Sequence, residues 1–375
     1  MREKAKTAEK LALEGGVIAS ARTTCSRTPA DSRTVLSFPF HQEADLREQY
    51  ANPWGGIRIG KIMEDLDALA GYVSFRHTDD GDPATPPLTL VTASIDKVKF
   101  KHDIRLDQAL ELVAEVVWTG RTSIDVAMEV ISGGVCCVKS NFIFVARDPE
   151  TNAAAPVNPL DPQDGRELEA WRDAERRADA RKMRADPDKH IITDTGAQLW
   201  GLSQVEESRV LKDLPALSRQ KMDALLVTDT ALQNTVITMP QERNIHGRIF
   251  GGLLCRRAYE LAFITAYSFS GLQPAFLEVD RVDFLQPVDI GDILQFSSRV
   301  LYSENRGVLG GGEQGVGYVE VQAVVISPDS VSSRRTNTFL FAFGFEGHIA
   351  TVVPETMEQA LKAHACASAA RTLYE

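Results

Sequence analysis

The chain has 375 residues, of which 43% are hydrophobic and 25% charged, as is typical of a globular protein with about two or three domains. A formal net charge of -11 and a pI near 5.3 exclude a general nucleic-acid binder, because phosphate binding requires a concentrated basic surface. Since no run of roughly 18 apolar residues occurs, we expect no helix that spans a membrane.

Residues 1–34 are predicted to form an extension ahead of the first domain. They lack the apolar core of a secretory signal, and their later part is rich in Arg, Ser and Thr, as in an organellar targeting peptide. The acidic residues Glu3, Glu9 and Glu14 are atypical of such a peptide. The mitochondrial matrix and the cytoplasm therefore both stay open as locations.

Cysteine usage indicates a reducing compartment and no metal centre. The five cysteines are scattered along the chain, and the one adjacent pair lacks the spacing of metal ligands. They are Cys25, Cys136, Cys137, Cys255 and Cys366.

The first half of the chain reads as one helix followed by strands. Residues 60–77 place Ile62, Leu66, Leu69 and Val73 at helical spacing, which predicts an amphipathic helix. About four apolar or alternating segments follow between turn signals, as in an antiparallel sheet. They are residues 88–100, 109–120, 122–133 and 136–147. This order indicates an α+β domain.

A segment of different composition, residues 148–224, is predicted to link the two halves. It begins with a stretch rich in Pro, Asn and Ala, and residues 166–189 then hold 15 charged residues, eight basic and seven acidic. We interpret the charged stretch as a solvated helix with i,i+4 ion pairs, which acts as a spacer or mobile insertion. A basic docking surface is the alternative.

The second half repeats the order of the first. A helix is predicted from about Gly252 to Phe269, and strand-like segments follow it up to residue 346. "IDKVKFKHDIRLDQALEL" (95–112) aligns without a gap on "VDRVDFLQPVDIGDILQF" (279–296). Internal duplication is therefore the main structural inference, and residues 347–375 remain as a helical tail.

Each half also carries an Asn-x-x-Gly turn eight residues before a glycine in the helix start. "NPWGGIRIG" (52–60) matches "NIHGRIFGG" (244–252), so Asn52 pairs with Asn244 and Gly60 with Gly252. Glycines there permit close backbone approach, and a helix start offers unpaired N–H groups. Asn and Gly are also the commonest turn formers, so one such turn alone is weak evidence for a site.

An acid follows two turns into each helix. Asp67 lies seven residues after Gly60, and Glu260 lies eight after Gly252. Apolar neighbours predict partial burial, which raises the pKa of an acid toward a value useful to a general base. The alternative is that Glu64, Asp65 and Asp67 form the exposed face of a surface helix.

The order of turn, long helix and antiparallel strands, with "DFLQPVDIGD" after the second helix, resembles the hotdog fold of acyl-CoA thioesterases. "PWGGIRIGKIMEDLDALAG" and "QERNIHGRIFGGLLCRRAYELAF" resemble the two halves of the double-hotdog acyl-CoA thioesterases of the mitochondrial type. The resemblance implies an α+β fold of tandem hotdog domains, residues 35–147 and 225–346, joined by the charged linker. In each domain a sheet wraps a long helix.

The resemblance also implies that each active site combines the turn of one half with the acid of the other. The implied pairs are Asn244 with Asp67 and Asn52 with Glu260. In thioester hydrolysis the acid would activate water, the asparagine would orient water or substrate, and N–H groups near Gly252 and Gly60 would donate to the oxyanion. The absence of a G-x-S-x-G motif argues against an α/β-hydrolase thioesterase.

Two neighbours of Asn244 are further candidates for a catalytic role. Glu242 is a second candidate base, because related hotdog thioesterases carry an acid there, but its counterpart in the first half is Tyr50. His246 aligns with Trp54, so a packing or turn role is favoured for it. The two predicted sites are therefore unequal.

The turn in "WTGRTSIDV" (118–126) resembles the turn that contacts coenzyme A in hotdog thioesterases. Backbone and hydroxyl donors of Gly120, Thr122 and Ser123 would face phosphates, and Arg121 would supply charge. The alternative is an ordinary hairpin turn. The second half has a glycine-rich insertion instead, with Arg306 as its one cation, which predicts weaker or altered binding.

The sequence thus predicts an acyl-CoA thioesterase that hydrolyses acyl-CoA to free acid and coenzyme A. It needs neither a metal nor an organic cofactor, and we expect a homo-oligomer, with a trimer of double hotdogs as one form. Two alternatives stay open. A hotdog enoyl-CoA hydratase usually shows Gly-Asp-x-Asn-Pro-x-His, whereas "QERNIH" lacks the Gly-Asp and the proline. The other is a catalytically inactive acyl-CoA-binding or scaffold protein.

Overall fold

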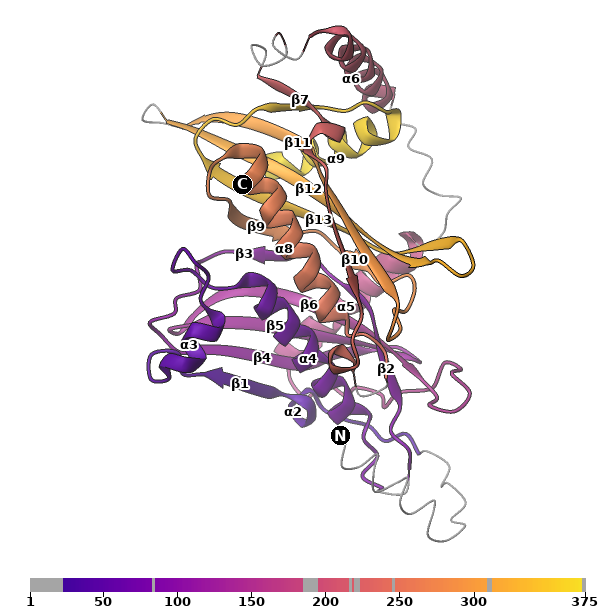
Figure 1. Cartoon of the computed structure of the whole chain (residues 1–375). Helices are drawn as coiled ribbons and strands as arrows, with labels where there is room; N and C mark the ends of the chain where they lie inside the picture. Colours follow the sequence, from indigo (N-terminus) through magenta and orange to yellow (C-terminus); the bar gives the residue numbers. More distant parts are fainter. Residues whose placement is uncertain are drawn as a thin grey trace. The chain divides into compact units, whose positions relative to one another are not determined.

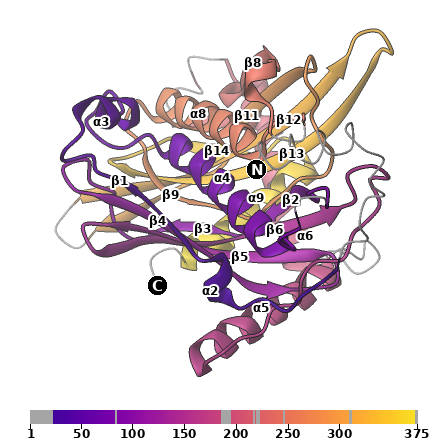
Figure 2. The same cartoon turned by 90° about the horizontal axis from the view of Figure 1, so that it is seen from below.

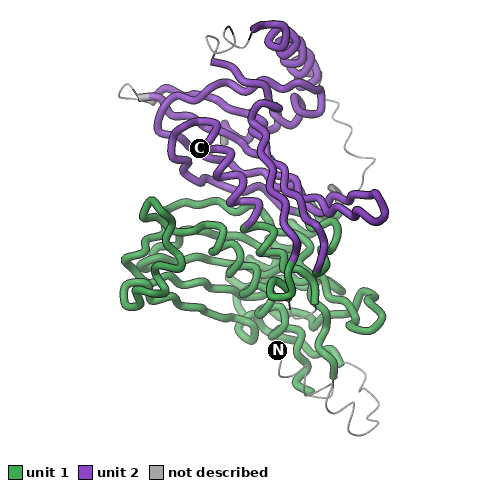
Figure 3. The backbone as a smooth tube through the Cα atoms, in the orientation of Figure 1, with its two compact units in different colours: residues 1–190, 239–256, 283–290 green, residues 191–238, 257–282, 291–375 purple. Residues whose placement is uncertain are grey.

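The computed structural model describes residues 23–82, 85–184, 195–215, 218, 223–244, 247–308 and 312–372. The chain forms two compact units (Figure 3). Unit 1 comprises Met1–His190, Met239–Arg256 and Asp283–Ile290, and unit 2 comprises Ile191–Thr238, Arg257–Val282 and Gly291–Glu375. In the described part of the chain, no helix combines the length and apolarity that crossing a bilayer requires.

The framework of unit 1 is an antiparallel sheet with one long helix on its face (Figure 1). Neighbouring strands pair in the order β1, β4, β5 and β6, and β6 also pairs with β2 and β3. The bounds are β1 Thr34–Phe38, β2 Thr89–Ile95, β3 Val98–Phe100, β4 Leu110–Thr119, β5 Ser123–Ser132 and β6 Val135–Arg147. The helices are α2 Pro29–Ser32, α3 Ala44–Tyr50, α4 Ile59–Thr78 and α5 Gly165–Arg184.

Helix α4 forms where the apolar spacing predicts it and packs on this sheet through that apolar face. Ile62, Leu66, Leu69 and Val73 are all buried. On β5, alternate residues point to opposite faces of the sheet, so the buried Ile124, Val126 and Met128 share one face. The helix prediction for the first half is confirmed.

Helix α5 corrects the interpretation of the charged linker as a solvated spacer. It lies against the sheet of unit 1, on the face opposite α4 (Figure 2). Its buried Ala174 and Ala178 pack on Val117 and Trp118 of β4. The spacing of these alanines places an apolar stripe on a helix whose other side is charged, and a stripe of small residues is easily overlooked in a charge run.

Ion pairs between side chains complete the docking of α5. Asp125 of β5 is fully buried, and Arg177 and Arg181 approach its Oδ2 at 3.4 and 3.3 Å. Asn141 donates to the other oxygen at 2.7 Å. A buried charge requires partners of this kind, so the basic residues of α5 serve its attachment.

Unit 2 repeats the arrangement of helix and sheet. Its strands pair in the order β9, β13, β12, β11 and β8, and β14 pairs with β7 in parallel. The bounds are β7 Ala224–Leu226, β8 Leu232–Ile237, β9 Ala275–Val279, β11 Ile293–Val308, β12 Gly312–Ser327, β13 Ser332–Glu346 and β14 Thr351–Val353. The helices are α6 Thr195–Asp213, η2 Val227–Thr230 and α9 Met357–Thr372, with residues 257–270 of α8 (Gly251–Ser270).

Both faces of the unit 2 sheet are covered. Tyr259 of α8 packs edge-on against Phe341 of β13, with ring centroids 5.9 Å apart. The next residue on β13, Ala342, points to the other face and contacts a cluster that includes Cys366 of α9. Each unit therefore has one long helix on an antiparallel sheet, which confirms the α+β fold of tandem hotdog domains.

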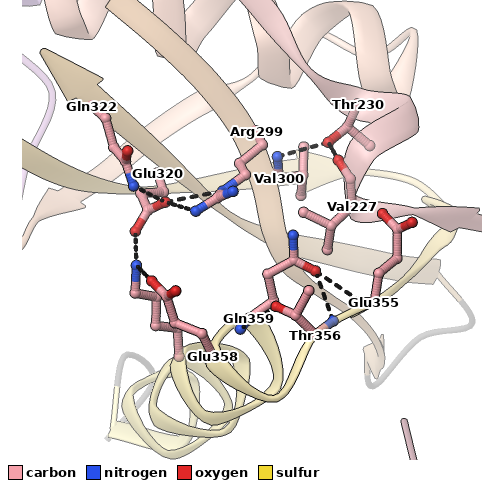
Figure 4. A network of polar contacts seen from close by, with 11 residues as sticks. Val227, Thr230, Arg299, Val300, Glu320, Gln322, Glu355, Thr356, Glu358 and Gln359 are labelled. Atoms are coloured by element: carbon pink, nitrogen blue, oxygen red, sulfur yellow. Dashed lines mark hydrogen bonds and ion pairs between the residues drawn. The ribbon is translucent and has the colours of Figure 1, made fainter. Parts of the chain in front are cut away.

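Helix α9 is also attached through a buried acid, as Figure 4 shows. Glu320 of β12 is almost fully buried and accepts from Arg299 at 2.6 Å and from Lys362 of α9 at 2.8 Å. The two cations hold the pKa of Glu320 below its usual value despite burial. The predicted helical tail is thus a packed element of unit 2.

Several elements were not anticipated from the sequence. Strands β1 and β8, which pair with β4 and β11, are short and lack a clear alternation of buried residues. Most of the glycine-rich insertion is strand, because β11 and β12 pair as far as Val308 and Gly312. The proposed domain boundaries stay a prediction, since the compact units follow spatial contacts and place Met239–Arg256 and Asp283–Ile290 in unit 1.

Candidate active site

The two Asn-Gly turns have the same backbone structure. Asn52 donates its N–H to the carbonyl of Gly56 at 2.8 Å, and Asn244 donates to that of Arg248 at 2.6 Å. In each turn the side-chain oxygen of the asparagine also accepts the backbone N–H of the residue four positions later. These bonds are 2.9 Å from Gly56 and 3.1 Å from Arg248. Both asparagines therefore hold their own turns together, in addition to any role with substrate.

The glycine three residues after each asparagine needs its conformational freedom. Gly55 has φ 81° and Gly247 has φ 79°, in the region that side chains with a Cβ rarely adopt. In both turns its N–H donates to the carbonyl of the asparagine. The duplication seen in the sequence is thus reproduced in backbone geometry.

Asp67 of α4 is the residue around which a site is built. Its side chain is fully buried, which rules out the exposed-face alternative for this acid. The Thr92 hydroxyl of β2 donates to Oδ1 at 2.9 Å, and the Gly252 N–H of α8 donates to Oδ2 at 2.6 Å. One oxygen is held by the first repeat and the other by the second.

Burial controls the acidity of Asp67. It raises the pKa of the carboxyl to about 6, against the opposing effect of the bonds from Thr92 and Gly252. The negative charge of Glu64, three residues earlier on α4, raises it further. A carboxylate with a pKa of about 6 is ionised at neutral pH and is a stronger base than an exposed aspartate.

Close packing requires a glycine at position 252, and its backbone N–H holds Asp67. A Cβ at this position would lie 2.8 Å from Cα of Glu64, a distance that real Cβ atoms do not show. In the structure the N–H of Gly252 itself donates to Asp67 at 2.6 Å. Gly252 therefore orients the carboxylate. Donation to the oxyanion by N–H groups near Gly252, and near the buried Gly60 in the first turn of α4, stays a prediction.

The acids beside Asp67 on α4 have separate partners. Glu64 forms an ion pair with Arg256 of α8 at 2.9 Å. Asp65 accepts a hydrogen bond from the hydroxyl of Tyr50 at 2.6 Å, and burial raises the pKa of Asp65. Neither acid has the two-sided cage of hydrogen bonds that surrounds Asp67.

Glu260 and Glu242 differ from Asp67 in their surroundings. The side chain of Glu260 is 36% exposed and forms an ion pair with Arg257 at 3.6 Å on the same helix. The carboxylate of Glu242 accepts the N–H of Met239 at 3.0 Å and so caps the short helix η3, Pro240–Glu242. Their catalytic roles stay predictions, and His246 lies outside the described residues.

The turn compared with a coenzyme A site is a tight hairpin between β4 and β5. Gly120 donates to the carbonyl of Ser123 at 2.9 Å, and the carbonyls of Arg121 and Thr122 accept from Val157 and Ala146. The Arg121 side chain is exposed. The backbone carbonyls are thus used within the fold, while the charge of Arg121 faces solvent.

Of the two implied residue pairs, one has both members in unit 1. Asn244 belongs to Met239–Arg256 and so to the same compact unit as Asp67. Asn52 belongs to unit 1 and Glu260 to unit 2, and their pairing stays a prediction. Sequence reasoning missed Thr92, because β2 also holds Thr89 and Ser94 and no local pattern singles out one polar residue of the strand.

Comparison with known proteins agrees with this architecture. Residues 60–137 match a family model described as Thioesterase superfamily. Over 352 residues, covering 89% of this chain and 79% of the relative, the chain is 43% identical to acyl-coenzyme A thioesterase 2, chloroplastic, of Humulus lupulus. It is 31% identical to acyl-coenzyme A thioesterase 9, mitochondrial, of Mus musculus over 89% of this chain and 76% of that protein.

Among solved structures, an apo-hexameric acyl-CoA thioesterase matches 44% of this chain and 99% of its own, with 30% identity and a TM-score of 0.37. The extent and level of identity to the curated relatives decide the assignment: the chain belongs to the family of acyl-coenzyme A thioesterases.

Proposed function

We propose that the protein hydrolyses acyl-CoA thioesters to free acid and coenzyme A, with Asp67 as the general base. The observation that carries this proposal is the buried carboxylate of Asp67, held by Thr92 and Gly252 at 2.9 and 2.6 Å, in a chain of this family. No covalent nucleophile is needed, because an ionised, desolvated carboxylate activates water directly.

The reaction begins when a water molecule donates a proton to Asp67 while its oxygen attacks the carbonyl carbon of the thioester. The tetrahedral oxyanion then collapses, the C–S bond breaks, and the coenzyme A sulfur leaves with the proton held by Asp67. Thr92 and Gly252 fix the two carboxylate oxygens throughout, so the base does not reorganise during the step. Asn244 is assigned to orient the water or the thioester carbonyl.

We infer that the site of Asp67 is the more active of the two expected from the duplication. Its acid is fully buried, whereas the acid of the second site, Glu260, is partly exposed and paired with a cation. Burial raises the pKa of Asp67, and a desolvated carboxylate accepts a proton from water more readily.

We propose that Gly120, Thr122 and Ser123 donate to the phosphates of coenzyme A and that Arg121 supplies charge. We also propose that the reaction needs neither a metal nor an organic cofactor. We infer an organellar location from the printed names of the relatives, which are chloroplastic or mitochondrial. We also propose a homo-oligomer, with a trimer of double hotdogs as one form, and light scattering tests this. Imaging of a fluorescent fusion of the full chain tests the location.

The test is release of free coenzyme A from a panel of acyl-CoA chain lengths. Asp67→Ala should abolish turnover, and Asn244→Ala should lower it more than Asn52→Ala, a matched control because both asparagines build the same turn. Undiminished hydrolysis by Asp67→Ala would overturn the site. Addition of water to a 2-enoyl-CoA would identify a hydratase, and binding without turnover a scaffold.

A further inference from the structure

A second polar connection joins α4 and α8 beside Asp67. Nη1 of Arg256 lies 2.9 Å from Oε2 of Glu64, and the two side chains are only 24% and 26% exposed. Glu64 lies three residues before Asp67, so both acids occupy the same side of α4. The ion pair is therefore next to the base and partly shielded from solvent, where it is worth more than an exposed pair.

The backbone of Glu64 meets the same helix one turn earlier. A Cβ on Gly252 would lie 3.0 Å from the carbonyl oxygen of Glu64 and 2.8 Å from its Cα, so no side chain separates the helices there. Gly252 and Arg256 are four residues apart and lie on one face of α8. Glu64 therefore contacts this face at two points, once through its backbone and once through its side chain.

We infer that the Glu64–Arg256 ion pair is a clasp that positions the first turn of α8 for its hydrogen bond to Asp67 and balances the charge next to that carboxylate. The inference rests on the proposed role of Asp67. Two contact points fix both the height and the rotation of residues 251–256 against α4, and the Gly252 N–H must be fixed in both to reach Asp67 at 2.6 Å. Glu64 and Arg256 touch no reacting atom and are positioning residues.

The charges around Asp67 predict that loss of Glu64 and loss of Arg256 shift the pKa of Asp67 in opposite directions. On α4, Glu64 raises the pKa of Asp67 by like-charge repulsion. On α8, the buried thiol of Cys255 has a raised pKa and is neutral, so Arg256 supplies the charge that offsets Glu64. On β2, Thr92 adds only a neutral hydroxyl. Removing Glu64 should therefore lower the pKa of Asp67, and removing Arg256 should raise it.

The first test is the pH profile of kcat/KM for acyl-CoA hydrolysis. We expect the acid limb of Glu64→Gln to move down by about 0.5 pH unit and that of Arg256→Gln to move up by a similar amount. The acid limb of the double variant should lie close to that of wild type, although its rate should be lower. The matched control is Glu129→Gln, which removes an exposed ion pair between Glu129 of β5 and Lys139 of β6. This control should change neither the acid limb nor the rate.

The second test does not depend on catalysis. Hydrogen exchange followed by mass spectrometry on the peptide that covers residues 250–256 reports protection of the Gly252 N–H. Both single variants should exchange at least tenfold faster there than wild type at equal global stability. The charge swap Glu64→Arg with Arg256→Glu should recover most of the protection, which keeps the test valid if a single variant folds poorly.

Shifts of the acid limb in the same direction, or unchanged exchange at residues 250–256, would overturn the clasp. Failure of the proposed function looks different: Asp67→Asn would then retain hydrolysis while the exchange data still report on the clasp.

Discussion

The N–H of Gly252 donates a hydrogen bond to Oδ2 of Asp67 at 2.6 Å, although 185 positions separate the two residues. Asp67 belongs to the helix of the first repeat and Gly252 to the start of the helix of the second. A helix start stabilises a nearby anion through its free N–H groups and its dipole. The duplicated chain thus uses one repeat to orient the acid of the other.

Replacing Asp67 by Asn should lower activity strongly and stabilise the fold. The burial that raises the pKa of Asp67 to about 6 makes its charge costly at neutral pH, by about 1–3 kcal/mol relative to an aspartate in the unfolded chain. We expect kcat to fall by about 100-fold or more and Tm to rise by a few degrees. Coenzyme A release and calorimetry measure the two effects, and a lower Tm would contradict the charge argument.

The pH dependence of kcat/KM should follow the same group. A general base works only when deprotonated, so activity should fall as pH drops through about 6. Stability changes in the opposite direction. Because the folded pKa lies above the unfolded value of 3.8, protonation of Asp67 between pH 6 and 4 removes a destabilising charge. An acid limb near pH 4 would indicate an exposed base and sink the assignment.

Thr92→Val should shift that limb upward. The hydroxyl stabilises the ionised form of Asp67, so its loss should raise the pKa by about one unit and cost about 1.5–3 kcal/mol of stability. Thr92→Ser retains the donor and is the control. Equal pH profiles for the Val and Ser variants would show that the hydrogen bond does not act on the base.

Glu260→Gln should leave the rate within a few-fold of wild type. Its carboxylate is partly exposed and paired with Arg257, so it lacks the desolvation that makes Asp67 basic. Steady-state rates with one acyl-CoA substrate compare Glu260→Gln with Asp67→Asn. If the Glu260 variant were the more damaged, the order of the two sites would be reversed.

Arg181→Met should destabilise unit 1 through the attachment of α5. Asp125 is fully buried, and Arg181, which is 13% exposed, approaches it at 3.3 Å. Loss of one of its two cations should lower the free energy of unfolding by up to about 3 kcal/mol. Arg176→Met on the exposed side of α5, where the partner is Asp173, should change it by less than about 0.5 kcal/mol. Denaturant unfolding followed by tryptophan fluorescence distinguishes the two.

Much of the fold was predictable because it is encoded in local spacing. The apolar positions of residues 60–77 predict α4. The internal repeat then predicts α8 and the second set of strands from the sequence alone. Strands β1 and β8 were missed because most of their residues are exposed, so they lack the alternation that marks a strand. The charged helix was identified, but its docking was not, because a buried Asp125 on a distant strand supplies the partner.

The sequence by itself determined the duplication, the two Asn-x-x-Gly turns and the acid two turns into each helix, because these are properties of residues close together in the chain. Only the tertiary structure decided which acid is buried, that Thr92 and Gly252 hold it, and that the N–H of Gly252 is directed at this carboxylate. Desolvation and hydrogen bonding across 25 and 185 positions depend on packing between distant segments, which no local pattern records.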